Sequence, residues 1–208
     1  MMMRQSMARL LALVLTAAFA GSISTAMAEG NAEAGQAKST PCIACHGADG
    51  NSSNPAWPSL AGQHAQYIVT QLQAFKSGAR KDPLMSPMAA GLSDSDIADL
   101  AAYFSTQKPK GLLAEADKLA LGQRLYRGGD ARTGIAACAA CHGASGDGNP
   151  AALYPALHGQ QATYIENQLK AYRAGTRQTD RNQVMRNVAS TMSDEQIAAV
   201  ASYVQGLR

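Results

Sequence analysis

Cys42-Ile43-Ala44-Cys45-His46 and Cys138-Ala139-Ala140-Cys141-His142 are two copies of the pentapeptide C-x-x-C-H, and together they use all four cysteines of the chain. This motif is typical of covalent haem c attachment. The two thiols add to the vinyl groups of one haem, and the histidine that follows is held beneath the iron as its proximal ligand. The sequence therefore predicts two covalently bound haem groups, on Cys42 and Cys45 and on Cys138 and Cys141, with His46 and His142 as proximal ligands.

Two other kinds of site share the C-x-x-C pair. A redox disulfide of this form is expected within a thioredoxin-like βαβ pattern, and no such strand pattern is found in the sequence. A structural zinc site takes four cysteine or histidine ligands. Here the two pairs lie 96 residues apart and each has its own histidine, which favours two independent sites.

Residues 1–28 have the features of a secretory signal peptide. Arg4 and Arg9 form a basic start, Leu10 to Ala20 is an apolar run too short to span a membrane, and Ala26-Met27-Ala28 is a small-x-small cleavage site. Cleavage there leaves 208 − 28 = 180 residues and lowers the formal charge from +3 to about +1. We expect an exported periplasmic protein, soluble or loosely associated with the membrane surface. The absence of a basic run and of an aromatic platform argues against a nucleic-acid partner.

An internal repeat predicts two domains. Residues 57–80 read WPSLAGQHAQYIVTQLQAFKSGAR and residues 154–177 read YPALHGQQATYIENQLKAYRAGTR. The offset between the copies drifts only from 96 residues at the cysteines to 97 in these segments and 100 near the C-terminus. Duplication of a whole domain explains this pattern. We expect an N-terminal haem domain at 29–107, a linker at 108–115 and a C-terminal haem domain at 116–208.

Both halves show the same order of elements, and all of them are helical. We expect a first helix at 32–38 and at 116–126, then the C-x-x-C-H motif in a turn. A second helix follows at 64–77 and at 163–174, ending at Gly78 and Gly175. A polar loop with methionine precedes a last helix, which begins after Ser93 or Ser193 with an S-x-x-D or S-x-x-Q sequence. No stretch alternates as a strand does, so the predicted class is all-α.

The sixth ligand of each iron decides between electron transfer and chemistry on a small molecule. The two spare histidines, His64 and His158, do not occupy equivalent positions in the repeat, so we interpret both as surface or loop residues. Met85 and Met185 each lie eight residues before the serine that starts the last helix, and they are the methionine pair that repeats in register. A methionine usually fills space in a core, but this registered pair in a chain with two haem motifs predicts axial thioether ligands.

The chain resembles the cytochrome c4 family of dihaem cytochromes, which consist of two tandem class I cytochrome c domains. The resemblance covers the mature chain and includes both C-x-x-C-H motifs, the W/Y-P-x-L-x-G-Q segments, the methionine loops and the S-D-x-x-I helices. It implies that the carbonyls of Pro58 and Pro155 accept the Nδ1 protons of the proximal histidines. It also implies that Gly35 and Gly122 allow a close crossing of the first and last helices. One departure is the longer loop at 127–137 in the second half, whose role the sequence does not define.

The function expected from this resemblance is that of a monomeric periplasmic carrier of single electrons. Its partners would be a quinol-oxidising complex and a terminal oxidase or another reductase. An electron-transfer subunit of a dehydrogenase is an alternative. A dihaem peroxidase is a weaker one, because that enzyme needs an open iron and the paired methionines argue against one.

Overall fold

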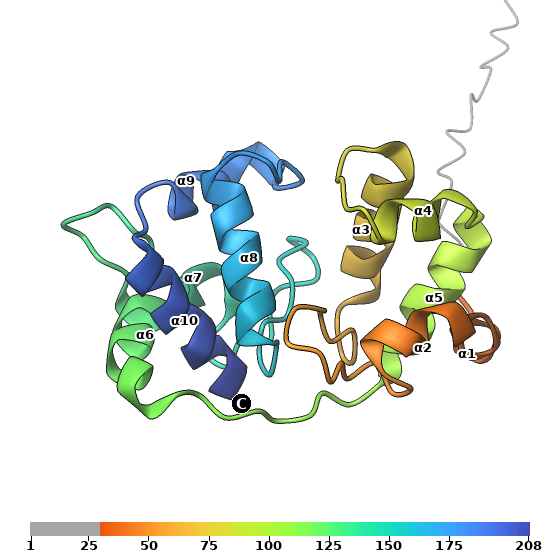
Figure 1. Cartoon of the computed structure of the whole chain (residues 1–208), viewed down its shortest axis with the longest axis horizontal. Helices are drawn as coiled ribbons and strands as arrows, with labels where there is room; N and C mark the ends of the chain where they lie inside the picture. Colours follow the sequence, from red (N-terminus) through yellow and green to blue (C-terminus); the bar gives the residue numbers. More distant parts are fainter. Residues whose placement is uncertain (1–29) are drawn as a thin grey trace, which may run out of the picture.

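The computed structural model describes residues 30–208, so the predicted signal peptide at 1–28 lies outside the described part of the chain. The described residues form two helical bundles joined by an extended segment (Figure 1). The first bundle contains α1 (Ala32–Lys38), α2 (Thr40–His46), α3 (Ala65–Ser77), α4 (Met85–Ala90) and α5 (Asp94–Thr106). The second contains α6 (Ala116–Gly128), α7 (Ala139–His142), α8 (Ala162–Arg173), the 3₁₀ helix η1 (Arg181–Gln183), α9 (Val184–Ala189) and α10 (Asp194–Gly206). Residues 30–208 contain no β-strand, only two isolated bridges, which confirms the all-α prediction.

In each bundle the first and last helices cross at a glycine, as the resemblance implied. α1 packs against α5, and α6 packs against α10. A Cβ atom at Gly35 would lie 2.8 Å from the Cβ of Tyr103, and one at Gly122 would lie 2.7 Å from the Cβ of Tyr203. Such separations leave no room for a side chain. The glycines therefore set how closely the two helices approach.

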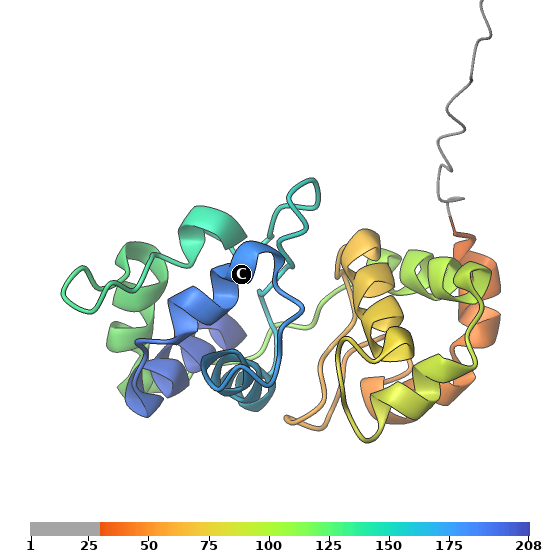
Figure 2. The ribbon, with the colours of Figure 1, turned by 90° about the horizontal axis from the view of Figure 1, so that it is seen from above.

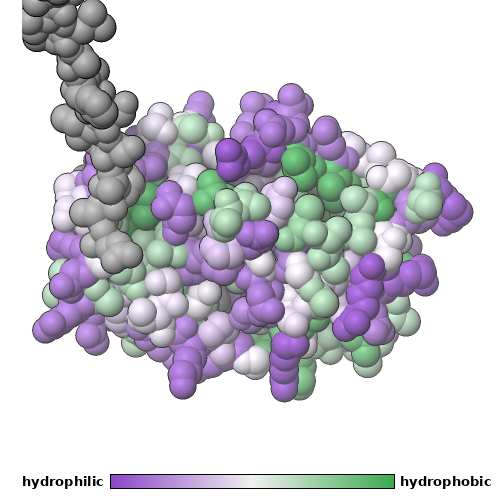
Figure 3. All heavy atoms as spheres, turned by 180° about the vertical axis from the view of Figure 1, so that it is seen from behind, coloured by the Kyte–Doolittle hydropathy of each residue, from purple (hydrophilic) through white to green (hydrophobic). Residues whose placement is uncertain are grey.

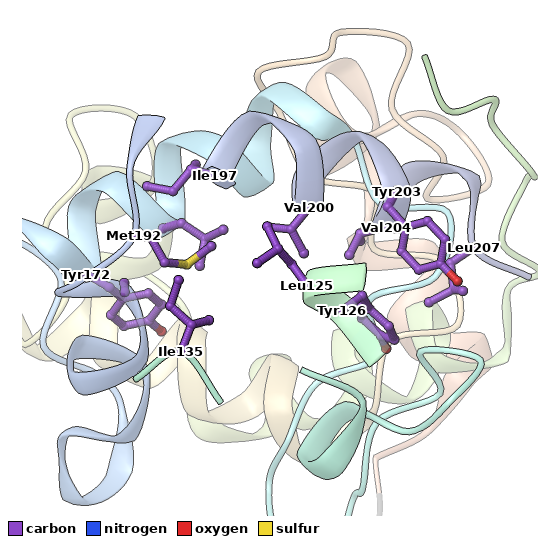
Figure 4. Close-up of a cluster of buried hydrophobic side chains, with 12 residues drawn as sticks. Leu125, Tyr126, Ile135, Tyr172, Met192, Ile197, Val200, Tyr203, Val204 and Leu207 are labelled. Atoms are coloured by element: carbon purple, nitrogen blue, oxygen red, sulfur yellow. The ribbon is translucent and has the colours of Figure 1, made fainter. Parts of the chain in front are cut away.

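Each bundle has its own apolar core. In the first, Ile68, Ile97, Leu100 and Phe104 are the centre of a cluster formed by α3 and α5. In the second, the cluster draws on α6, α8 and α10 and includes Ile135 from the longer loop (Figure 4). Ile135 is only 4% exposed, so part of this loop contributes to the core.

Local signals set most helix boundaries correctly. Ser93 and Ser193 both form full capping boxes, with Asp96 and Gln196 at the third helical position. Gly78 ends α3 in the left-handed conformation at φ 77°.

Two predictions about local structure were wrong. The C-x-x-C-H motifs were expected in turns, but the first lies in helix α2 and the second forms the N-cap and all of helix α7. The methionines were expected in loops, but Met85 begins α4 and Met185 lies in α9. These four helices have four to seven residues. Helices this short carry too little periodicity to be recognised in sequence, and tertiary packing stabilises them.

The two bundles meet through reciprocal glutamines. Gln63 donates from Nε2 to the carbonyl of Ala156 at 2.9 Å and accepts the N–H of Ala156 at 3.0 Å. Its repeat counterpart Gln160 donates to the carbonyl of Ser59 and accepts the N–H of Ser59, both at 2.8 Å. Each glutamine thus pairs with a backbone amide of the other bundle, as a strand partner would. This pairing relates the halves by an approximate two-fold axis, and Figure 2 shows them side by side from a second direction.

The outer surface mixes hydrophilic and apolar residues. Seen from behind, apolar patches occur along the upper part of the molecule on both halves (Figure 3). Of the large apolar side chains described, Leu84 and Leu113 are the most exposed, at 57% and 78%. No helix within residues 30–208 is long and apolar enough to cross a membrane.

Candidate functional site

A cavity of about 1170 Å³ lies between and inside the two bundles. Pockets for single small molecules usually measure roughly 300–1,000 Å³, so this one has room for more than an ordinary ligand. Its walls include every haem-related residue predicted from the sequence: Cys42, Cys45, His46 and Met85 from the first half, and Cys138, Cys141, His142 and Met185 from the second. The structure therefore places both predicted sets of haem-binding residues around one continuous cavity.

The two predicted proximal histidines have the same burial and the same kind of hydrogen-bond partner. His46 and His142 are each 6% exposed. Nδ1 of His46 lies 2.8 Å from the carbonyl oxygen of Pro58, and Nδ1 of His142 lies 2.9 Å from that of Pro155. Because a carbonyl only accepts, Nδ1 carries the proton and Nε2 keeps a free lone pair. Burial lowers the pKa of both imidazoles, against the opposing effect of the carbonyl hydrogen bond. Both rings are thus neutral and have a fixed tautomer, as a metal-binding imidazole requires.

The cysteines lack the electrostatics of a redox C-x-x-C site. Burial raises the pKa of the Cys42 thiol and, in the second half, raises the pKa of the Cys138 thiol to about 11. Catalytic C-x-x-C thiols instead have a lowered pKa, which makes them nucleophilic thiolates. All four cysteines are free of disulfides. Within residues 30–208, no group of three or more metal-ligating side chains of the His, Cys, Asp and Glu types converges on one point.

The spare histidines both lie outside helices, in agreement with their interpretation as surface or loop residues. His64 is the residue immediately before α3, and its Nε2 is buried without a hydrogen-bond partner among the described residues. His158 lies in a loop, where its Nδ1 is 3.2 Å from the carbonyl oxygen of Gly146, and its side chain is 24% exposed. Neither residue is a fully exposed surface histidine. Neither lines the cavity, in contrast to Met85 and Met185.

An arginine network between the bundles was missed in the sequence. The Arg80 guanidinium donates to Gln71 of its own bundle at 2.8 Å and to Tyr164 and Gln168 of the other at 3.2 and 2.8 Å. Arg177 mirrors it, donating to Gln168 at 2.7 Å and, across the boundary, to Tyr67 and Gln71 at 2.9 and 3.0 Å. The signal was present, since these polar residues are identical in the two repeat segments: Tyr67 and Tyr164, Gln71 and Gln168, Arg80 and Arg177. They had been used only to establish the duplication.

The charge and position of these two arginines bear on whether the cavity can hold haem. Arg177 is 6% exposed, and neither Arg177 nor Arg80 forms an ion pair with a carboxylate within residues 30–208. Both line the cavity and share the acceptors Gln71 and Gln168, so two like charges lie close together. Buried charges without a counter-ion are costly. The propionates of a haem are anions, so the cavity offers apolar walls, thiols, neutral imidazoles and cations that all fit this group.

Comparison with known proteins decides the family. The family model described as Cytochrome c matches residues 32–108 and again 119–208. Cytochrome c4 of Pseudomonas aeruginosa is 45% identical over 199 residues, which cover 95% of this chain and 98% of the relative. The chain belongs to the cytochrome c4 family. This cytochrome accordingly carries two covalently bound haem c groups in two tandem domains, and it is an electron carrier rather than an enzyme.

A solved structure and a second relative extend the comparison of this cytochrome. The crystal structure of reduced recombinant cytochrome c4 from Pseudomonas stutzeri has a TM-score of 0.84 and 44% identity, and the match covers 86% of this chain and all of that one (100%). A protein of Thiomonas intermedia named thiosulfate dehydrogenase electron acceptor is 45% identical over 168 residues, covering 78% of this chain and 76% of the relative. The first match confirms the predicted two-domain cytochrome architecture.

Proposed function

We propose that this cytochrome carries single electrons in the periplasm, from a quinol-oxidising complex to a terminal oxidase or another reductase. Its domains would be residues 29–107 and 116–208, joined by a linker at 108–115, after removal of a signal peptide at 1–28. In this proposal it acts as a monomer, free or loosely attached to the membrane surface.

The geometry of the cavity supports the proposed ligand sets, since all their residues line it. Thioether bonds would form at Cys42 and Cys45 for one haem and at Cys138 and Cys141 for the other. His46 and Met85 would complete the first iron site, and His142 and Met185 the second. Haem iron supplies the one-electron redox chemistry when bound. The chain contributes the neutral imidazoles, held by the carbonyls of Pro58 and Pro155, and thioether ligands that raise the reduction potential.

One observation carries the proposal: both C-x-x-C-H motifs and both registered methionines line a single cavity across the domain boundary. Two redox centres in one shared space favour electron exchange between them. The arginines that cross the boundary contribute a fixed positive field to that space. A fixed polar surrounding keeps reorganisation on electron transfer small.

The test is spectroscopy on the mature periplasmic protein. We expect two irons per chain, low-spin spectra, a methionine–ferric charge-transfer band, and no response of the reduced protein to carbon monoxide. Met85→Leu and Met185→Leu should each remove about half of the methionine–ferric band, since both haem irons contribute to it. A high-spin wild type that binds carbon monoxide would refute the methionine ligation.

A second candidate is an electron acceptor dedicated to a dehydrogenase. The similarity to the thiosulfate dehydrogenase electron acceptor of Thiomonas intermedia favours it. Stopped-flow reduction distinguishes the two: the wild-type cytochrome is mixed in turn with a quinol-oxidising complex and with a thiosulfate dehydrogenase. Fast reduction only by the dehydrogenase would replace the respiratory proposal by this one.

A further inference from the structure

The segments that carry the two methionines are built differently, although the domains are duplicates. From Gly78 to Met85 is seven residues, whereas from Gly175 to Met185 is ten. The offset is 97 residues at Arg80 and Arg177 and 100 at the methionines, so the three extra residues lie just before Met185. This is where η1 is found, and the first bundle has no counterpart of it.

In the first bundle, prolines and backbone caps fix the methionine segment. Pro83 and Pro87 flank Met85 and restrict φ without requiring any polar partner. Oδ1 of Asp82 accepts the N–H groups of Leu84 and Met85, both at 2.9 Å. This acceptor role needs an oxygen atom and no net charge, so an asparagine could fill it.

In the second bundle, the residues at the corresponding places do not restrict the backbone. Asn182 and Gln183 both adopt positive φ angles, 51° and 60°, directly before the helix that carries Met185. Left-handed conformations of two consecutive non-glycine residues are strained and persist only where the surroundings impose them. Something must therefore hold this segment in place.

An ion pair spans the strained segment. Asp180 accepts the backbone N–H of Arg186 through Oδ2 at 2.9 Å and the Arg186 Nε through Oδ1 at 2.8 Å. The side chain of Asp180 is only 3% exposed, while that of Arg186 is 24% exposed. The two partners enclose residues 181–185, which contain both strained residues and Met185. A buried carboxylate with one cationic partner is well suited to such a clamp, because its charge is strongly destabilised when the partner is lost.

We infer that Asp180 and Arg186 are positioning residues for Met185, so that the iron of the C-terminal domain has the methionine that is displaced first. The inference rests on the proposed axial ligation. Without the clamp, the backbone at 182 and 183 relaxes and withdraws the thioether. The open iron then accepts a small neutral ligand such as carbon monoxide when reduced. The first iron stays closed, because its methionine segment depends on prolines.

The experiment compares Asp180→Asn with the matched control Asp82→Asn in the haem-loaded protein. In Asp180→Asn we expect loss of about half of the methionine–ferric band and binding of about one carbon monoxide per reduced chain. Asp82→Asn should retain the whole band and bind none, because its amide oxygen still caps the two N–H groups. Circular dichroism and iron content establish that each variant is folded and loaded.

Arg186→Gln provides an independent test if Asp180→Asn does not assemble, and Arg186→Lys, which keeps the charge, should recover part of the band. The inference is overturned if both clamp variants keep the full band and bind no carbon monoxide, or if Asp82→Asn opens its iron equally. A wild type without the band would instead refute the proposed methionine ligation itself, so the two failures are distinguishable.

Discussion

The reciprocal glutamines make a prediction about how firmly the two domains are docked. Gln63→Ala removes the hydrogen-bond partner of the Ala156 N–H and that of the Ala156 C=O. Ala156 is only 9% exposed. A buried backbone group without a partner costs about 1–3 kcal/mol, so the docked state loses about 2–6 kcal/mol. When the domains separate, water binds these groups. The cost therefore weakens docking more than it destabilises either bundle.

The lower limit of about 2 kcal/mol corresponds to a roughly 30-fold larger fraction of separated molecules. Hydrogen exchange at the Ser59 amide measures that fraction, because Gln63→Ala leaves its bond to Gln160 in place and the proton exchanges only when the domains separate. We expect its exchange to accelerate by at least that factor, with amides in the middle of α10 unchanged. The mirror variant Gln160→Ala should accelerate the Ala156 amide, which stays bonded to Gln63, in the same way.

Gln66→Ala is the matched control. Gln66 is an exposed glutamine in the first turn of α3, and its side chain has no hydrogen bond within the described residues. It should leave the Ser59 amide unchanged. If Gln63→Ala also leaves that amide within about threefold of the wild-type rate, the glutamine contacts do not determine docking and the reasoning from buried groups is wrong.

Three further predictions concern stability and the linker. Gly122→Ala should lower the free energy of unfolding, measured by urea titration, by about 1–3 kcal/mol, because the helices at this crossing cannot separate freely. The control Gly128→Ala lies in the same helix. A Cβ atom there meets nothing within 4 Å, so this variant should have little effect. Ser193→Ala should cost about 1 kcal/mol, measured in the same way, through loss of the cap of α10. The hydrogen bond from Lys110 lowers the pKa of Asp49 to about 2, so the stabilisation this carboxylate gives is present above pH 4 and is lost as the pH falls from 4 to 2. A fall in the free energy of unfolding between pH 4 and pH 2 that is smaller in Asp49→Asn is the expected result; an equal fall in both proteins would contradict it.

The comparison of methionine segments shows how a duplicated fold can diverge at a functional site. The proposed ligand type and its place before the last helix are preserved, whereas the means of holding the proposed ligand is not. The restraint that a proline places on the backbone depends only on its own ring. The restraint from a buried ion pair depends on two residues and on their exclusion from water. The second arrangement is therefore the one that a single substitution is expected to open.

Much of this protein was determined by the sequence alone, because the features concerned are local or repeated. The C-x-x-C-H motif consists of five consecutive residues, and each capping box at Ser93 and Ser193 spans four. The two-domain architecture follows from a repeat whose copies align along the sequence. The close crossings at Gly35 and Gly122 followed from the family resemblance. In all these cases the physical cause lies in residues that are close in sequence or aligned by duplication.

Only the tertiary structure decided what happens between the domains. The contacts of Gln63, Gln160 and Arg177 across the boundary join residues 93 to 110 positions apart. No local pattern specifies which distant backbone amide a glutamine reaches. The burial of Arg177 and the proposed clamp on Met185 likewise depend on packing that excludes water. The residues proposed to bind haem could thus be named from sequence, but the surroundings that hold and tune them exist only once the two halves are folded against each other.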